Sequence, residues 1–188
     1  MTTRRINFYG GPGSGKSTIA HHATAIFKKR GCRAEMAREF VKHWTYYDRV
    51  PTAWDQVHIF GQQIQEESIL LENGIDYVIA ECPLVLGAWY ADSLDHELAM
   101  NLLKLARRFD EAFPAIHIYL DRGNLEFDPV GRFSVHSPEK IESMDRSLYR
   151  FVSDYVGAGN LQIISSPFNK WELNRLLAKI VMSNASLE

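Results

Sequence analysis

The segment GGPGSGKS, residues 10–17, constrains the fold of this chain more than any other feature of the sequence. It matches the pattern G-x-x-x-x-G-K-[ST], whose glycines let successive backbone N–H groups point inward and form a nest for an anion. The pattern needs a strand before it and a helix after it. An apolar run at residues 6–9 and a helical pattern at residues 16–30 supply both. The sequence therefore predicts a loop that binds the phosphates of a nucleoside triphosphate.

The positions of this loop have separate expected tasks. Lys16 is long enough to reach the β- and γ-phosphates of ATP, and the Ser17 hydroxyl is a suitable ligand for Mg²⁺. The helix that starts near Lys16 adds the positive end of its dipole. ATP and Mg²⁺ are the expected cofactors. The residues expected to bind the nucleotide are Gly11, Gly13, Ser14, Gly15, Lys16, Ser17 and Thr18.

The rest of the chain alternates between strand and helix patterns. Strands are predicted at residues 6–9, 32–37, 77–80, 115–120 and 161–164, and helices at residues 16–30, 53–72, 94–111, from 137 onward and at 169–182. This alternation is typical of an α/β fold with a parallel sheet. We expect a three-layer P-loop kinase fold, with a five-stranded parallel sheet, helices on both faces and a lid loop at about residues 121–136. A length of 188 residues with 46% hydrophobic content suits a single domain over residues 1–188.

Two carboxylates follow predicted strands, at the sheet edge where ligands bind in folds of this kind. Glu81 ends the run VIAE, so we expect it to hold Mg²⁺ through water. Glu39 follows the strand at residues 32–37, and we expect it to accept the proton of an attacking hydroxyl or to orient that hydroxyl. Arg38, next to Glu39, is either a substrate contact or the partner of Glu39 in a surface ion pair.

The polar loop at residues 121–136 is long for a compact domain, and loops of this length are usually functional or disordered. It carries Arg122 and Arg132, which as lid residues would swing onto the transferring phosphate and exclude water. Gly131 allows a sharp turn, which makes Arg132 the stronger candidate. Phe168 follows the last predicted strand, where it either stacks on adenine or packs in the core.

The acceptor side has less specific signals. Gln63 lies on the helix at residues 53–72, where its amide either reads a nucleobase with two hydrogen bonds or belongs to the polar helix surface. The stretch HWTYYDRVPTAW, residues 43–54, is rich in aromatic residues, among them Tyr46 and Tyr47. Beside basic residues such as Arg38, these rings would stack the bases of a nucleic-acid strand, wall a pocket for a free nucleoside, or pack in the fold.

Charge is distributed unevenly along the chain. Residues 1–50 hold ten Lys or Arg and three Asp or Glu, a balance of +7, whereas residues 51–100 hold nine acids and no Lys or Arg. The basic segment suits an acidic ligand, or it is a solvated helix face. The net charge of −2 argues against a strongly basic nucleic-acid binder.

The order of motifs GGPGSGKST, AREF, DQVHIFGQQ, DYVIAECPLVL and DPVGR resembles a family of small P-loop kinases. That family includes the ribosylnicotinamide kinase domains of NAD-biosynthesis enzymes and phage nucleotide-kinase-like proteins, among them phage kinases of 5-hydroxymethyluracil in DNA. The resemblance covers roughly residues 5–168. It implies that Lys16 and Ser17 serve ATP and Mg²⁺, that Glu39 serves the acceptor hydroxyl, that Glu81 serves the metal, and that Arg122 and Arg132 are lid residues. Glu81 departs from the pattern, because many relatives have Asp there.

The leading hypothesis is an ATP-dependent kinase that phosphorylates a hydroxyl of a nucleoside-like acceptor. A 5-hydroxymethyluracil base within phage DNA is favoured as the acceptor, because the basic N-terminal quarter and Tyr46 and Tyr47 fall on the acceptor side. The alternatives are a kinase of a free nucleoside, a nucleotide or nicotinamide riboside, and a regulatory NTP-binding module without catalysis.

The expected location is the cytoplasm, or the host cytoplasm for a phage protein. Cys32 and Cys82 lack metal-ligand spacing and suit a reducing compartment. No signal-peptide core is recognisable, and no apolar run approaches the roughly 18 residues that span a bilayer. The seven histidines form no ligand pattern, so no metal beyond Mg²⁺ and no membrane contact are expected.

Overall fold

The computed structural model describes residues 4–47, 49–126, 128, 137–165 and 170–185. The strands are β1 Arg4–Tyr9, β2 Ala34–Ala37, β3 Tyr77–Ala80, β4 Ala115–Asp121 and β5 Leu161–Ser165. The helices are α1 Lys16–Lys29, α2 Ala53–Glu72, α3 Leu84–Asp92, α4 His96–Ala112, α5 Pro138–Val156 and α6 Lys170–Ala185, with the 3₁₀ helices η1 Phe40–Tyr47 and η2 Ala158–Asn160. Each predicted strand and helix is present, with ends shifted by at most about three residues.

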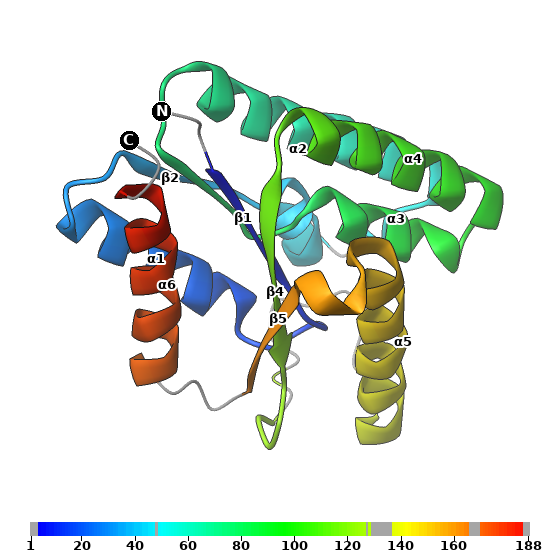
Figure 1. Cartoon of the computed structure of the whole chain (residues 1–188). Helices are drawn as coiled ribbons and strands as arrows, with labels where there is room; N and C mark the ends of the chain where they lie inside the picture. The colour runs from blue at the N-terminus through cyan, green and yellow to red at the C-terminus, as the bar shows by residue number, and fades with distance from the viewer. Residues whose placement is uncertain (1–3, 48, 127, 129–136, 166–169, 186–188) are drawn as a thin grey trace.

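The strands form one parallel sheet in the order β2-β3-β1-β4-β5 (Figure 1). Helices α1 and α6 cover one face, and α2 to α5 cover the other (Figure 1). Successive side chains of β1 alternate between these layers, because strand residues point to opposite faces in turn. Ile6 and Phe8 pack against α1 and α6, whereas Tyr9 packs on the side of α3 and α5. The predicted three-layer α/β architecture is therefore confirmed.

The helix ends follow capping rules that the sequence makes visible. Ser137 caps α5 by accepting a hydrogen bond from the Lys140 N–H, and Pro138 occupies the first helical position. Thr52 and Asp55 form a reciprocal capping box at the start of α2. In the part of the chain that the structure describes, no helix is both long and apolar enough to cross a membrane.

Helix α3 is the α-helix that the sequence analysis missed. Its sequence, LVLGAWYAD, is apolar on nearly all sides, and Leu84, Val85 and Leu86 are all buried. A helix that is covered on every side has no polar face, so it lacks the 3.6-residue alternation that marks a surface helix. Because α3 follows β3 after a three-residue turn, its first turn lies at the ligand-binding edge of the sheet.

Candidate functional site

The phosphate-binding loop joins β1 to α1, where the sequence placed it. Gly13 and Gly15 have φ angles of 74° and 90°, in the left-handed region that favours glycine, and Gly15 caps the N-terminus of α1. Lys16 folds back over the loop, and its Nζ donates hydrogen bonds to the carbonyl oxygens of Gly10 and Gly11 at 2.7 and 3.1 Å. A helix N-terminus beside a lysine is an arrangement that binds phosphate groups.

Ser14 and Thr18 take different places in this loop. The Ser14 side chain is buried, and its Oγ has no hydrogen-bond partner among the described residues. A buried polar atom without a partner is costly unless a ligand or water satisfies it. Thr18 is exposed in the first turn of α1. The loop therefore has unused hydrogen-bonding capacity where a phosphate would bind.

A serine and a carboxylate meet beside the loop. The Ser17 hydroxyl donates a hydrogen bond to Oε1 of Glu81, which comes directly after β3. Glu81 reaches this point because β1 and β3 are neighbouring parallel strands in which Asn7 pairs with Ala80. Hydroxyl and carboxylate oxygens suit Mg²⁺, which takes its remaining ligands from water and substrate phosphates. The described residues contain no group of three or more His, Cys, Asp or Glu side chains that would bind a metal by themselves.

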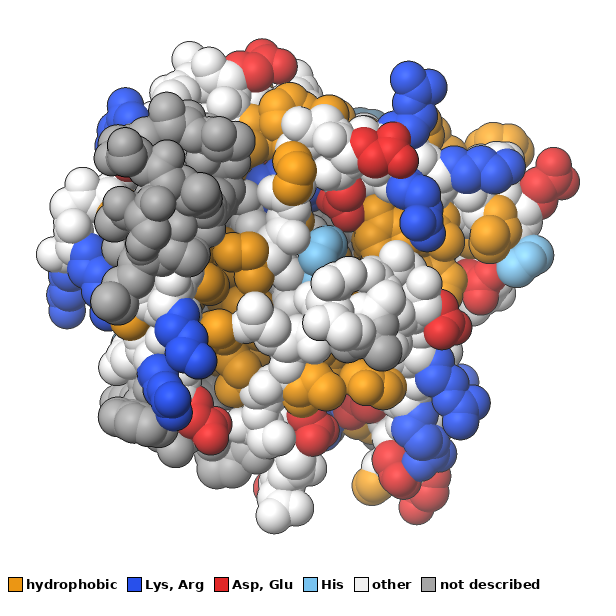
Figure 2. Space-filling model, in the orientation of Figure 1, with side chains coloured by type: hydrophobic (Ala, Val, Ile, Leu, Met, Phe, Trp, Pro, Cys, Tyr) orange, Lys and Arg blue, Asp and Glu red, His pale blue; other side chains and the backbone are white. Residues whose placement is uncertain are grey.

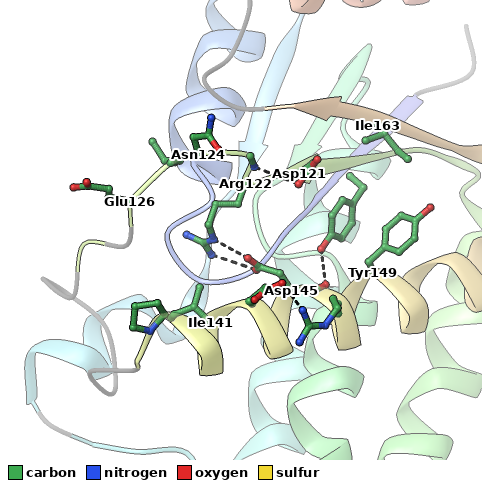
Figure 3. A pocket seen from close by; sticks show the side chains of 14 residues that line it. Asp121, Arg122, Asn124, Glu126, Ile141, Asp145, Tyr149 and Ile163 are labelled. Carbon is green, nitrogen blue, oxygen red and sulfur yellow. Dashed lines mark hydrogen bonds and ion pairs between the residues drawn. The ribbon is translucent and has the colours of Figure 1, made fainter.

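Arg122 is fixed against the phosphate-binding loop. Its Nε and Nη2 donate to the two carboxylate oxygens of Asp145 at 2.7 and 3.2 Å (Figure 3). Nη2 also donates to the Pro12 carbonyl at 2.6 Å. Tyr119 donates to the backbone carbonyl of Asp145 at 2.9 Å. The Asp145 carboxylate lies so close to Gly11 that a Cβ built there would be 1.8 Å from it. Arg122 is thus held in an ion pair that joins α5 to the loop, rather than extended on a swinging lid.

Two other predicted site residues lie outside the described part of the chain. They are Arg132, the favoured arginine of the lid, and Phe168, the residue expected to stack on adenine. Both roles stay predictions. The described part of the predicted lid runs from Asp121 to Glu126 and includes residue 128.

A cavity of about 890 Å³ opens beyond Arg122, between the ends of β4 and β5 and the first half of α5 (Figure 3). Tyr119 and Tyr149 form one wall, with their rings edge to face and 5.2 Å apart. Ile141 and Ile163 add apolar surface to the cavity. On the molecular face drawn in Figure 2, apolar side chains lie near the middle and charged side chains lie mostly toward the margin. Among the described residues, the charged ones of the lining are Asp121, Arg122, Glu126, Glu142, Asp145 and Arg146. Because carboxylates outnumber guanidinium groups, the cavity suits a neutral flat ring better than a polyphosphate.

A second, much smaller cleft lies on the other side of the loop, at the ends of β2 and β3. It is lined by Glu39, Phe40, Val41, Ile59, Phe60, Gln63, Cys82, Pro83, Leu84 and Gly87. The structure thus brings together Glu39 and Gln63, two residues predicted to contact the acceptor. The volume of about 10 Å³ holds roughly one water molecule, so a larger ligand requires η1, α2 and α3 to separate.

Cys82 connects this cleft electrostatically to the loop. Burial, followed by the negative charge of Glu39, raises the pKa of the Cys82 thiol well above its usual value, while the charge of Lys16 acts in the opposite direction. Cys82 is therefore a neutral thiol within electrostatic range of both groups. Lys16, which is expected to bind the donor phosphates, and Glu39, which is expected to contact the acceptor hydroxyl, thus lie near the same edge of the sheet.

Arg38, Tyr46 and Tyr47 lie outside this cleft. Arg38 is exposed, and Tyr46 and Tyr47 are 66% and 80% exposed near the end of η1. Trp44 is the aromatic residue of this stretch that packs, with the Arg49 guanidinium 3.8 Å from its ring centroid. The structure therefore presents Tyr46 and Tyr47 as surface residues, and neither lines the two cavities.

Sequence reasoning overlooked several residues that build the site. Phe40, Phe60 and Cys82 line the smaller cleft, and Asp145 fixes Arg122. Phe60 carried a usable signal, since it belongs to the apolar face of the predicted helix at residues 53–72. Asp145 carried none, because only the folded chain brings α5 against the loop.

The fold and the loop together define a P-loop nucleotide-binding protein of the α/β class. A family model described as an AAA domain matches residues 5–155, and the chain belongs to this family. No match was found among curated proteins.

Two solved structures share this fold. The NadR protein in complex with NR has a TM-score of 0.66 and 14% sequence identity, and the alignment covers 87% of this chain and 46% of that one. The NadR protein in complex with NAD and AMP-PNP has a TM-score of 0.64 and 13% identity, covering 87% and 44%. The chain therefore spans less than half the length of these NadR chains, and the likeness confirms the predicted P-loop kinase-type fold.

Proposed function

We propose that this protein is an ATP-dependent phosphotransferase that moves the γ-phosphate of ATP to a hydroxyl of a nucleoside-like acceptor. The observation that carries the proposal is the convergence of two sets of groups at one sheet edge. Ser17 and Glu81 meet beside Lys16, and Glu39 lines a cleft next to them. A protein that binds a nucleotide without transferring its phosphate has no need of a carboxylate such as Glu39 in a neighbouring cleft.

The chemistry follows from these positions. The acceptor hydroxyl oxygen bonds to the γ-phosphorus while the bond from that phosphorus to the β–γ bridging oxygen breaks and ADP leaves. Glu39 accepts the hydroxyl proton. Lys16 stabilises negative charge on the phosphates, and Ser17 and Glu81 would hold Mg²⁺ directly or through water. Mg²⁺, when bound, neutralises charge on the β- and γ-phosphate oxygens.

The large cavity beside Arg122 supports a purine donor. It adjoins the loop through the contact between Arg122 and Pro12, and its volume is in the range of small-molecule sites. Tyr119 and Tyr149 supply aromatic surface for a flat ring. A base in this cavity would leave the triphosphate to extend along the loop toward Ser17.

The small cleft supports a nucleoside-like acceptor. Phe40 and Phe60 line it with aromatic rings, Gln63 with an amide, and Glu39 with the carboxylate proposed to accept the hydroxyl proton. The structural relatives were solved with NR and with NAD, so nicotinamide riboside joins free nucleosides and nucleotides among the acceptors to test. The tight cleft agrees with an acceptor that enters as η1 and α2 move apart.

A second candidate acceptor is a base presented on a DNA strand, such as 5-hydroxymethyluracil. The supporting observation is that η1 lines the cleft with Phe40 at one end and exposes Tyr46 and Tyr47 near the other. Exposed aromatic rings stack on bases of single-stranded nucleic acid. A base entering the cleft from such a strand would have to leave its stack first.

The test is transfer of label from γ-labelled ATP in the presence of Mg²⁺. The acceptors are nicotinamide riboside, free nucleosides, nucleotides, plain DNA and single-stranded DNA containing 5-hydroxymethyluracil. Label on a small acceptor supports the first candidate, and label on the modified DNA alone supports the second. Bound ATP with no labelled acceptor would refute phosphotransfer to these acceptors and favour a regulatory module.

Glu39 is tested in the same assay. Glu39→Gln should lower kcat by about 10²- to 10⁴-fold, the usual contribution of a general base. Glu35→Gln is the matched control, because Glu35 lies on β2, four residues earlier, and pairs at the surface with Lys28. Equal activity of the two variants would refute the role of Glu39.

A further inference from the structure

The orientation of the Gln63 amide is set from inside the protein. The Gln63 side chain lines the acceptor cleft, and the residue is only 4% exposed. Its Nε2 donates a hydrogen bond of 3.2 Å to Oε1 of Glu67, one turn further along α2. An amide has one donor end and one acceptor end, so this bond decides which end faces away from Glu67.

Glu67 acts as the acceptor in this bond because Arg5 lies on its other side. Arg5 Nε and Nη2 lie 2.8 and 2.7 Å from Glu67 Oε2, and both side chains are fully buried. Burial raises the pKa of Glu67, and the neighbouring Arg5 charge opposes that rise. A carboxylate beside a permanently charged guanidinium has acceptor oxygens and no proton to donate. It therefore accepts from the N–H of Gln63 and repels the amide oxygen.

Arg5 is itself held in place on the far side. It donates to an Asp110 oxygen at 2.5 Å and to the Phe113 carbonyl at 2.9 Å, and Tyr155 donates to the other Asp110 oxygen at 2.7 Å. The network thus runs from α4 and α5 through β1 to the acceptor cleft. Turning the Gln63 amide over would break its hydrogen bond to Glu67 and bring two acceptor oxygens together in a buried site, which is costly.

We propose that the Arg5–Glu67 pair fixes Gln63 so that its carbonyl oxygen faces the acceptor, and that the site thereby selects acceptors whose ring carries an N–H donor. The proposal deepens the proposed phosphotransfer and rests on it for the identity of the cleft. The ligand class is a planar carboxamide, imide or amino-substituted ring seated between Phe40 and Phe60. Gln63 contacts the acceptor, whereas Glu67 and Arg5 are positioning residues.

An acceptor without this donor would leave the Gln63 oxygen buried and unpaired. An unsatisfied buried acceptor is costly, so kcat/KM should be about 10- to 100-fold lower for such a molecule. The difference should appear mainly in KM, because the contact is distant from the reacting hydroxyl. Gln63 donates one of its two N–H groups to Glu67, which leaves its second N–H and its carbonyl oxygen for a ligand.

The experiment compares two nucleosides that differ only in a ring N–H, for example uridine and its N3-methyl derivative. For each, kcat, KM and the ligand-induced rise in Tm are measured, so that binding is read independently of turnover. Wild-type protein should prefer the N–H form by about 10- to 100-fold in kcat/KM, and Gln63→Met should lower that preference to about 1. A wild-type preference near 1 in both measurements would overturn the proposal.

The positioning role is tested by removing both partners. Arg5→Met/Glu67→Met replaces the buried ion pair by apolar side chains, a change that need not destabilise the fold. Its Gln63 amide is free to turn, so the preference for the N–H form should fall below about 3-fold. Asp110→Asn is the matched control, because it alters Arg5 without touching Gln63, and it should keep the wild-type preference. A double variant that folds and keeps that preference would refute the role of the pair.

The two proposals fail differently. Discrimination in the Tm measurement without any phosphate transfer would support the selection rule and contradict the phosphotransferase. Transfer to both nucleosides at equal kcat/KM and with equal shifts in Tm would support the phosphotransferase and contradict the selection rule.

Discussion

Replacing Gly11 by alanine tests whether Asp145 is the reason for a glycine at that position. The Gly11 φ angle lies outside the left-handed region, so its backbone accepts any residue. The obstacle is the Asp145 carboxylate, since a Cβ on Gly11 would lie 1.8 Å from Oδ1. The carboxylate would have to turn away and lose its contacts of 2.7 and 3.2 Å with Arg122.

The cost can be estimated from the pair that is lost. Arg122 and Asp145 are only 11% and 20% exposed, and hydrogen bonds to charged groups contribute about 1.5–3 kcal/mol. Gly11→Ala should therefore lower the free energy of unfolding by about that amount. For a domain of this size, 1 kcal/mol corresponds to about 2–4 °C, so Tm should fall by about 3–12 °C.

The assay is thermal unfolding of a double-mutant cycle. Asp145→Ala should cost a similar amount, and Gly11→Ala should cost little more once Asp145 is gone, which gives a coupling of about 1.5–3 kcal/mol. Gly61→Ala is the control, because no atom lies within 4 Å of a Cβ built there and alanine favours the α2 helix. Additive costs of the two variants would refute the steric explanation, as would a Gly11→Ala variant as stable as wild type.

Three further outcomes are expected. Asp76→Asn should lower Tm at about pH 7, and this loss should shrink as pH falls below 3.8. The side-chain hydrogen bond from Arg33 lowers the pKa of Asp76 below 3.8, so its stabilisation is present above 3.8 and is lost as pH falls through the folded pKa. A loss in Tm that does not change with pH would contradict this. Glu81→Gln should raise the Mg²⁺ concentration for half-maximal transfer by about 10- to 100-fold, measured by Mg²⁺ titration, and an unchanged midpoint would contradict the metal role. Leu102 is 3% exposed and packs between α3 and α4, so Leu102→Ala should lower the free energy of unfolding in urea by about 2–5 kcal/mol. A loss below about 1 kcal/mol would contradict this and show that the helices close over the space left by the side chain.

The sequence predicted the sheet and the loop because both depend on local signals. Each of these signals lies within a few residues of the chain: the apolar run at residues 6–9, the glycines before Lys16 and the carboxylate after β3. The meeting of Ser17 and Glu81 followed from one topological rule, that the carboxyl ends of parallel strands share an edge.

The parts that were not predicted depend on contacts between distant segments. Asp145 is 134 residues from Gly11 along the chain, the difference between the two numbers, and nothing near either residue signals their contact. Arg5 and Glu67 are 62 residues apart, and both appear in the sequence as ordinary charged residues. Helix α3 was missed for a different reason. It is buried on nearly every side, so its sequence shows no alternation between apolar and polar residues.

The strand order places the two proposed substrate sites on opposite sides of the loop. Strand β1 and its loop lie in the middle, the cleft with Glu39 lies toward β2 and β3, and the cavity beside Arg122 lies toward β4 and β5. Under the proposed function, substitutions in η1 and α2 would alter which molecule receives the phosphate and leave the nucleotide half intact. A library of variants restricted to residues 40–63 would be the economical way to redirect this scaffold to a new acceptor.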